Sequence, residues 1–220
     1  MDSAALARLT GHDIGDPALF HQALTHGSTG EAADYQRLEF LGDRVLGLTI
    51  AELLYQRFPR ASEGQMAAWY NRLVSRETCA TVAQDAGIND HIRLGKQARD
   101  DGGSKSINIL GDVTEAIIGA LYLDGGMAAA SGFIARYWDA MLQAIEQAPK
   151  HPKSALQEWA AANRRKTPSY ELVSRDGPDH DLRFTVRVSI NGIGEVTATG
   201  NSKQEAETLA AQEFMKAHIA

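Results

Sequence analysis

Four carboxylates lie in two apolar segments of the chain, and their spacing places each pair on one face of a helix. Residues 38–48 carry one pair four residues apart, and residues 109–118 carry the other pair three residues apart. The four residues are Glu39, Asp43, Asp112 and Glu115. Because a buried carboxylate without a partner is costly, such groups normally pair with a cation or bind a metal ion. Four facing carboxylates would need a hard cation, and ligation by oxygen alone favours Mg²⁺ or Mn²⁺.

Each pair taken alone has a simpler explanation. A helix face exposed to water, or an ion pair with Arg37, Arg44 or Arg72, would also accommodate two carboxylates. Two such pairs in two apolar segments favour the metal site over this explanation. The sequence patterns of other metal and nucleotide sites are absent, namely Glu-x-x-His tetrads, His-Glu-x-x-His, a phosphate-binding loop and an EF-hand loop.

Helical periodicity runs through the chain up to the proline at position 149, with apolar residues recurring at three- and four-residue spacing. Asp16 followed by Pro17 is typical of a helix start, and Pro59 follows a helix end. The expected helices cover residues 16–25, 35–58, 63–86, 109–122 and 127–145. Glycine is unfavourable inside a helix, so the glycines in these segments predict close contacts between helices. They are Gly42, Gly47, Gly111 and Gly119.

A short polar run with two prolines, residues 146–152, predicts a linker between domains. We therefore expect an all-α domain over residues 1–147, a linker over 148–152 and a second domain over 153–220. The second domain has the order α-β-β-β-α, which predicts a small α+β fold with a three-stranded antiparallel sheet and both helices on one face. Its expected elements are a helix at 153–162, strands at 170–174, 182–190 and 194–199, and a helix at 202–217.

The composition excludes several classes of protein. The chain has 220 residues, of which 44% are apolar and 23% charged, so it is neither disordered nor a coiled coil. Its single cysteine, Cys79, excludes a disulfide scaffold. Its apolar runs are too short to span a bilayer and no basic signal segment opens it, so we expect a cytoplasmic protein without membrane contact.

The charge is divided unevenly. The net charge is −6, with 12 Lys and Arg against 19 Asp and Glu before residue 149, and 10 against 9 after it. An acidic protein that binds a polyanion must concentrate its basic residues on one face or use metal ions to offset its acids.

The octapeptide QRLEFLGD at 36–43 closely resembles the signature of the ribonuclease III endonucleases. The segments ALTH at 23–26 and DVTEAIIGA at 112–120 support this resemblance. The second half resembles a double-stranded-RNA-binding domain, through LQE at 156–158, the loop at 177–181 and TGNSK at 199–203. Together these segments follow the domain order of bacterial ribonuclease III.

The resemblance implies Mg²⁺-dependent hydrolysis of double-stranded RNA, with Mn²⁺ as a substitute and no small-molecule substrate. By similarity, Glu39, Asp43, Asp112 and Glu115 bind metal, and Asp43 and Glu115 take part in catalysis. Phe40 matches an aromatic residue that enters a socket on the partner subunit of a homodimer. The expected products carry 5′ phosphates and short 3′ overhangs, and the expected substrates are ribosomal RNA precursors and structured messenger RNAs.

The resemblance also assigns RNA contacts, and it exposes departures from the family pattern. Gln157, Glu158, His180 and Lys203 are the expected RNA-binding residues. The position held by Gln36 is usually Glu, so one negative charge is missing beside the metal ligands. Lysines are also thinned after position 203, where Gln204 and Glu207 stand. Fewer lysines at this helix would weaken RNA binding, whereas Gln36 alone keeps open an alternative, a catalytically weak protein that binds and regulates double-stranded RNA.

Overall fold

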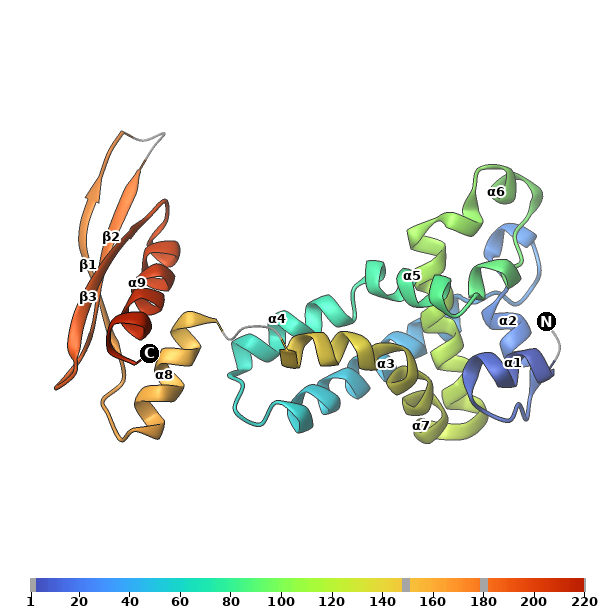
Figure 1. Cartoon of the computed structure of the whole chain (residues 1–220). Helices are drawn as coiled ribbons and strands as arrows, with labels where there is room; N and C mark the ends of the chain where they lie inside the picture. Colours follow the sequence, from blue (N-terminus) through green and yellow to red (C-terminus); the bar gives the residue numbers. More distant parts are fainter. Residues whose placement is uncertain (1–2, 148–150, 179–181, 220) are drawn as a thin grey trace. The chain divides into compact units, whose positions relative to one another are not determined.

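The protein is described by a computed structural model covering residues 3–147, 151–178 and 182–219. The chain divides into two compact units, Met1–Gln147 and Ala148–Ala220 (Figure 1). Each unit has its own hydrophobic core. The expected fold class, an all-α unit followed by an α-β-β-β-α unit, is confirmed.

Among the described residues of the first unit, the regular secondary structure is helical, apart from one isolated bridge between Thr25 and Arg93. Its α-helices are α1 (Ser3–Thr10), α2 (Pro17–Ala23), α3 (Gln36–Arg57), α4 (Glu63–Leu73), α5 (Arg76–Asp85), α6 (Lys96–Asp100) and α7 (Ile107–Gln147). Three 3₁₀ helices join them, η1 (Gly27–Thr29), η2 (Ile88–His91) and η3 (Gly103–Lys105). The sequence pattern predicted α3 closely but missed α1 and α6, which are short.

The prediction of one helix over 63–86 was wrong, because two helices, α4 and α5, occupy this segment. The Ser75 hydroxyl accepts a hydrogen bond from the Thr78 N–H at 3.2 Å and caps the start of α5. At the end of α4, the Leu73 carbonyl accepts a bond from the Trp138 indole N–H at 2.8 Å. These partners satisfy backbone groups that a helix end leaves free, which makes the break stable.

The two helices predicted at 109–122 and 127–145 are confirmed: they are the two parts of α7, which meet at a kink where Gly126 leaves the helical conformation. Gly126 has φ 70° and ψ −168°, a conformation that glycine adopts most readily. Just before the kink, the Asp124 carboxylate accepts hydrogen bonds from the backbone N–H groups of Gly15 and Asp16, and lies 2.9 Å from His12 Nε2. The kink is therefore tied to the segment between α1 and α2.

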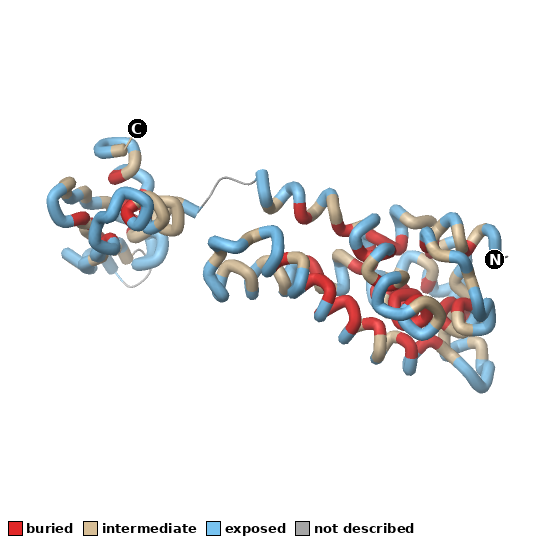
Figure 2. The backbone as a smooth tube through the Cα atoms, turned by 90° about the horizontal axis from the view of Figure 1, so that it is seen from below, coloured by how far each residue is buried: buried red, intermediate tan, exposed pale blue. Residues whose placement is uncertain are grey.

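Helices α3 and α7 supply much of the core of the first unit. Figure 2 shows the buried residues of this unit in red along its helices. By length and composition α7 could cross a membrane, which the short apolar runs did not predict. In this unit, 44% of its most apolar stretch is buried, and one helix of this length and composition is weak evidence for a membrane span. Its large buried residues, such as Ile117 and Trp138, fill the core rather than face outward.

The second unit pairs three strands with two helices. The elements are α8 (Pro152–Ala162), β1 (Ser169–Asp176), β2 (Arg183–Ile190), β3 (Gly194–Gly200) and α9 (Lys203–His218). The sheet has the order β1-β2-β3 and is antiparallel throughout. Helices α8 and α9 cover one face of the sheet, as predicted (Figure 1). Strand β1 is longer than the predicted 170–174 and contains an irregularity between Leu172 and Ser174.

Candidate active site

Two glycines allow α3 and α7 to approach closely. A Cβ atom at Gly42 would stand 1.7 Å from the Glu115 carbonyl oxygen, and one at Gly119 would stand 2.3 Å from the Leu38 carbonyl oxygen. No side chain larger than hydrogen fits at either position, which is the close contact that the helical glycines predicted. The crossing places the first turns of α3 beside the first turns of α7.

This crossing brings three of the four sequence-predicted metal ligands together. One carboxylate oxygen each from Glu39, Asp112 and Glu115 lies within 4.8 Å of the others. All three residues are half-buried, so their carboxylates are shielded in part but still reachable from solvent. The remaining carboxylate, Asp43, lies outside this group and accepts a hydrogen bond from Arg44 Nη1 at 2.7 Å.

Gln36, which stands where the family usually has Glu, is the first residue of α3. The residue is exposed, and its backbone N–H donates to the Asp34 carboxylate at 3.1 Å. Gln36 shares the first turn of α3 with Glu39, so a carboxylate in its place would add negative charge beside the group.

Two residues beside the carboxylates were not predicted from the sequence. The Tyr35 hydroxyl donates to Asp112 Oδ2 at 3.1 Å, and Arg76 Nη2 lies 3.9 Å from Asp112 Oδ1. Tyr35 directly precedes the octapeptide, which is a local signal that could have identified it. Arg76 begins α5, some 36 positions before Asp112 in the chain, so only the fold brings the two together.

Burial and mutual repulsion raise the pKa values of these acids. Burial is the largest cause for Glu115, whose pKa rises to about 8, and the charges of Asp43, Glu39 and Asp112 raise it further. Burial and the charge of Asp112 likewise raise the pKa of Glu39. Burial beside Asp112 also raises the pKa of Tyr35, so its hydroxyl keeps its proton and remains a donor to Asp112.

The donor set fits a hard divalent cation. Mg²⁺ prefers oxygen ligands at about 2.0–2.1 Å and usually keeps several waters, so it needs a few carboxylates and an open side. Three oxygens within 4.8 Å, on partly exposed side chains, meet these requirements. Burial, followed by the charges of the neighbouring carboxylates, raises the pKa of Glu115, and a bound cation would favour its ionised form.

An apolar stripe lies along the exposed side of α3. Phe40, Leu48 and Tyr55 are spaced eight and seven residues apart, which places them on one face of the helix. Their exposed fractions are 65%, 60% and 74%, respectively. The Arg44 guanidinium covers the Phe40 ring at 4.1 Å from its centroid. A row of large exposed apolar residues of this kind is typical of a surface that binds another protein.

In the second unit, the predicted RNA-binding residues have different environments. Gln157 is exposed on α8, whereas Glu158 is half-buried. Lys203 is exposed at the first residue of α9, and its Nζ lies 4.0 Å from Glu207 Oε1. Glu207 also pairs with Lys153. His180 lies outside the described residues.

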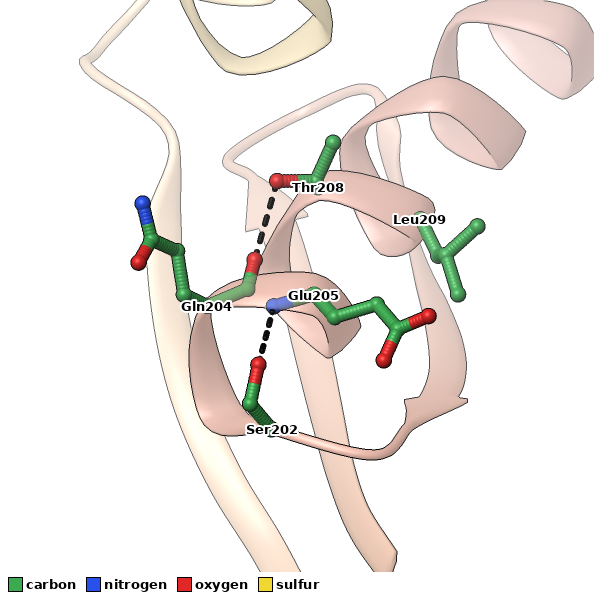
Figure 3. Close-up of a pocket in the computed structure, with 5 residues that line it drawn as sticks. All are labelled: Ser202, Gln204, Glu205, Thr208 and Leu209. Carbon is green, nitrogen blue, oxygen red and sulfur yellow. Dashed lines mark hydrogen bonds between the residues drawn. The ribbon is translucent and has the colours of Figure 1, made fainter.

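A surface depression adjoins Lys203 at the start of α9. It is lined by Ser202, Gln204, Glu205, Thr208 and Leu209 (Figure 3). The Ser202 hydroxyl accepts a bond from the Glu205 N–H, and the Thr208 hydroxyl donates to the Gln204 carbonyl oxygen. The first of these bonds caps α9 and fixes the direction of its positive end.

Comparison with known proteins covers both units. Residues 16–141 match the family model described as ribonuclease-III-like, and residues 152–217 match the double-stranded RNA binding motif. The chain is 57% identical over 205 residues to ribonuclease 3 of Zymomonas mobilis subsp. mobilis, covering 93% of this chain and 83% of that protein. It is 46% identical over 216 residues to ribonuclease 3 of Caulobacter vibrioides, covering 96% and 94%.

Solved structures give the same result for the helical unit. A crystal structure of the nuclease domain of Campylobacter jejuni ribonuclease III matches with a TM-score of 0.60 and 32% identity, over 63% of this chain and 94% of that chain. A second structure of that domain, described by flexibility in a region involved in dimer formation, matches with a TM-score of 0.59 and 31% identity, over 63% and 99%. With the acidic group between α3 and α7 and the α-β-β-β-α unit that follows, these similarities show that the chain belongs to the ribonuclease III family, the double-stranded-RNA endoribonucleases.

Proposed function

We propose that the protein cleaves double-stranded RNA at the carboxylate group of Glu39, Asp112 and Glu115, with Mg²⁺ as cofactor and Mn²⁺ as a substitute. The observation that carries this proposal is the convergence of three carboxylate oxygens within 4.8 Å, from two helices that glycines hold together. When bound, a divalent cation would lower the pKa of a water molecule and stabilise negative charge on the phosphate.

The side chains have separate roles in this proposal. Glu39, Asp112 and Glu115 would hold the cation, and the Tyr35 hydroxyl would orient Asp112. Asp43 would be the fourth carboxylate, once its side chain leaves Arg44 and turns toward the group. Asp43 and Glu115 are the residues to which we assign catalysis. The products would be fragments with 5′ phosphates and short 3′ overhangs.

The second unit would hold the RNA duplex. Domains of this kind recognise the shape of A-form RNA over about 16 base pairs, through 2′-hydroxyl and phosphate contacts. We assign Gln157, Glu158 and His180 to minor-groove contacts and Lys203 to a phosphate. Lys203 stands at the capped start of α9, where the helix dipole favours an anion.

Two copies of the chain would form the active enzyme. The exposed stripe of Phe40, Leu48 and Tyr55 is the surface that we assign to a homodimer, with Phe40 inserted into the partner. A two-fold axis would give two symmetric centres, one for each RNA strand, and hence staggered cuts. We place this enzyme in the cytoplasm, where it would process ribosomal RNA precursors and structured messenger RNAs.

A cleavage assay on a long, perfectly paired RNA tests the proposal. The wild-type protein should give short 5′-phosphorylated fragments with Mg²⁺ and intact RNA with EDTA. Glu115→Gln should abolish cleavage, because it removes a ligand charge while keeping the shape of the side chain. The matched control is Glu146→Gln, on an exposed part of the same helix, which should cleave like the wild type.

The alternative, a catalytically weak binder that regulates double-stranded RNA, rests on Gln36. This residue removes one negative charge from the turn that carries Glu39. Intact RNA under all conditions, together with a mobility shift on a native gel, would favour this alternative over the nuclease. Cleavage by the wild type and not by Glu115→Gln would exclude it.

A further inference from the structure

We propose that Arg76 is a further active-site residue, which binds the phosphate that is being cleaved. The proposal rests on the nuclease function proposed above and adds a cationic group to its acidic site. It is carried by the position of the Arg76 guanidinium against α7, by its free hydrogen-bond donors and by its exposure.

The fold places the Arg76 side chain directly against the metal-ligand turn of α7. A Cβ atom at Gly111 would stand 2.9 Å from Arg76 Cγ, so the absence of a side chain at Gly111 makes room for the arginine stem. Arg76 Nη1 donates to Asn108 Oδ1 at 3.2 Å, and Nη2 lies 3.9 Å from Asp112 Oδ1. The guanidinium thus lies along one face of α7, between two residues four positions apart.

Most of the hydrogen-bonding capacity of Arg76 remains open to a ligand. A guanidinium has five N–H donors, and the described contacts use one of them, on Asn108. At 3.9 Å the contact with Asp112 is too long for a hydrogen bond. The Arg76 side chain is 55% exposed, whereas Asp112 is 19% exposed, so the cation lies on the solvent side of the acid. An incoming phosphate would meet Arg76 as it reaches the carboxylates.

A purely structural role explains this arrangement poorly. Arg76 is the first residue of α5, where the helix dipole disfavours a positive charge. A half-exposed ion pair at 3.9 Å adds little to stability. By contrast, Arg44 forms a close pair with Asp43 at 2.7 Å, which leaves it less free to bind a ligand.

The chemistry of phosphodiester hydrolysis needs a group of this kind. The oxygen of a water molecule bonds to phosphorus, the bond from phosphorus to the 3′ oxygen breaks, and the 3′ oxygen takes up a proton while the water loses one. Negative charge on the non-bridging oxygens increases on the way to the transition state. A guanidinium can bind two of these oxygens at once and exchanges no proton in doing so.

Arg76 also offers a consequence for metal binding that a structural role would not produce. Its positive charge acts on Glu39 and Glu115 as well as Asp112. It therefore repels an Mg²⁺ ion that binds to these carboxylates. Removal of Arg76 should therefore strengthen Mg²⁺ binding in the absence of RNA while it slows cleavage. Opposite changes in these two quantities distinguish a phosphate-binding cation from a residue that supports the fold of the site.

The test compares Arg76→Ala and Arg76→Lys with Arg72→Ala, at an exposed arginine in the last turn of α4. Titration calorimetry with MgCl₂ alone should give an Mg²⁺ dissociation constant about threefold lower for Arg76→Ala, the size expected for exposed unit charges a few ångströms apart. Single-turnover cleavage at saturating Mg²⁺ and RNA should slow at least about tenfold, as for loss of one anion-binding group. Arg76→Lys should recover part of the rate, and Arg72→Ala should match the wild type in both measurements.

Two results would overturn the proposal while the nuclease function stands. Cleavage by Arg76→Ala at the wild-type rate, with the wild type active, would remove Arg76 from the reaction and leave the nuclease function intact. A slower rate accompanied by weaker Mg²⁺ binding and a lower melting temperature would assign Arg76 to the structure of the site. If the wild-type protein does not cleave RNA in Mg²⁺, the proposed function fails first and the role of Arg76 fails with it.

Discussion

Gly42 of α3 packs directly onto the backbone of Glu115 in α7, so closely that a Cβ atom would stand 1.7 Å from the Glu115 carbonyl oxygen. This contact sets the distance between the two helices, and the helices carry the carboxylates of the site. The position of Glu39 relative to Asp112 and Glu115 therefore depends on a residue that has no side chain.

Gly42→Ala is expected to destabilise the protein, because the added methyl group must push α3 and α7 apart. Overpacking of this kind costs about 1–3 kcal/mol, and a backbone contact this short places the change at the upper end. Urea unfolding of the helical unit measures it. The control is Gly132→Ala in α7, where a Cβ atom meets nothing within 4 Å and where replacing a helical glycine should stabilise by about 0.5–1 kcal/mol. Equal effects of the two substitutions would contradict the role assigned to Gly42.

The acid group also makes stability depend on pH and on Mg²⁺. The pKa of Glu115 is raised to about 8, so the folded protein holds this proton more tightly than the unfolded chain does. The resulting contribution is fully present below the unfolded pKa, near 4.3, and is lost as pH rises toward 8. Without metal, the melting temperature should therefore decline as pH rises over this range. The amount by which Mg²⁺ raises the melting temperature should become larger over the same range.

Differential scanning calorimetry between pH 5 and pH 8.5, with EDTA or with Mg²⁺, measures both trends. Glu115→Gln should lose this part of the pH dependence, because it has no proton to release. An Mg²⁺ effect that is constant over the pH range would show that the cation does not replace a proton on Glu115.

The sequence predicted the acid pairs and the helix that carries the first of them, because helical spacing and an apolar background are local signals. It predicted less well how each side chain is directed. Glu39 and Asp43 share a face by spacing, yet Asp43 pairs with its neighbour Arg44 and lies outside the group of three oxygens. A rotamer and a charged neighbour decide this, and neither is part of the periodicity.

Contacts between segments far apart in the chain could not be predicted from sequence periodicity. Arg76 reaches Asp112 because α4 and α5 separate at Ser75, and the prediction of one helix over 63–86 concealed that break. The break is stabilised by Trp138, which packs in the core and whose indole N–H donates to the Leu73 carbonyl oxygen. A hydrogen bond across 65 residues leaves no periodic pattern in the sequence.

Gln36→Glu is expected to lower the Mg²⁺ concentration needed for half-maximal cleavage. The substitution adds a negative charge to the first turn of α3, on the side of Glu39, and raises the local attraction for a divalent cation. Cleavage rates across an MgCl₂ series measure the effect, with Gln56→Glu at the exposed end of the same helix as the control. An unchanged Mg²⁺ titration would show that position 36 does not contribute to metal binding.

Phe40→Ala is expected to weaken the proposed homodimer. Phe40 is 65% exposed in a single chain, with the Arg44 guanidinium over its ring, so its burial by a partner would remove a large apolar area from water. Analytical ultracentrifugation over a concentration series should show a dissociation constant at least about tenfold higher, since aromatic anchors are typical hot spots. Leu172→Ala, which removes an exposed apolar side chain in the second unit, should leave the assembly unchanged. A monomeric wild-type protein would remove the basis for this assignment.

The last prediction concerns Glu207, which holds two lysines near the proposed RNA surface. Its carboxylate pairs with Lys153 and lies 4.0 Å from Lys203, the expected phosphate-binding residue at the start of α9. Glu207→Gln should free both cations, so the affinity for double-stranded RNA should rise and the dependence of log affinity on log salt should steepen by about 1 for each additional phosphate that a freed lysine binds. Fluorescence anisotropy at several salt concentrations, with EDTA present to prevent cleavage, measures both.

Glu213→Gln is the matched control, because Glu213 pairs with Lys216 at 2.7 Å in the last turns of the same helix, away from Lys203. Weaker RNA binding by Glu207→Gln would mean that the carboxylate orients Lys203 for the phosphate instead of competing for it, since a lysine without its partner carboxylate keeps its charge but loses its fixed position.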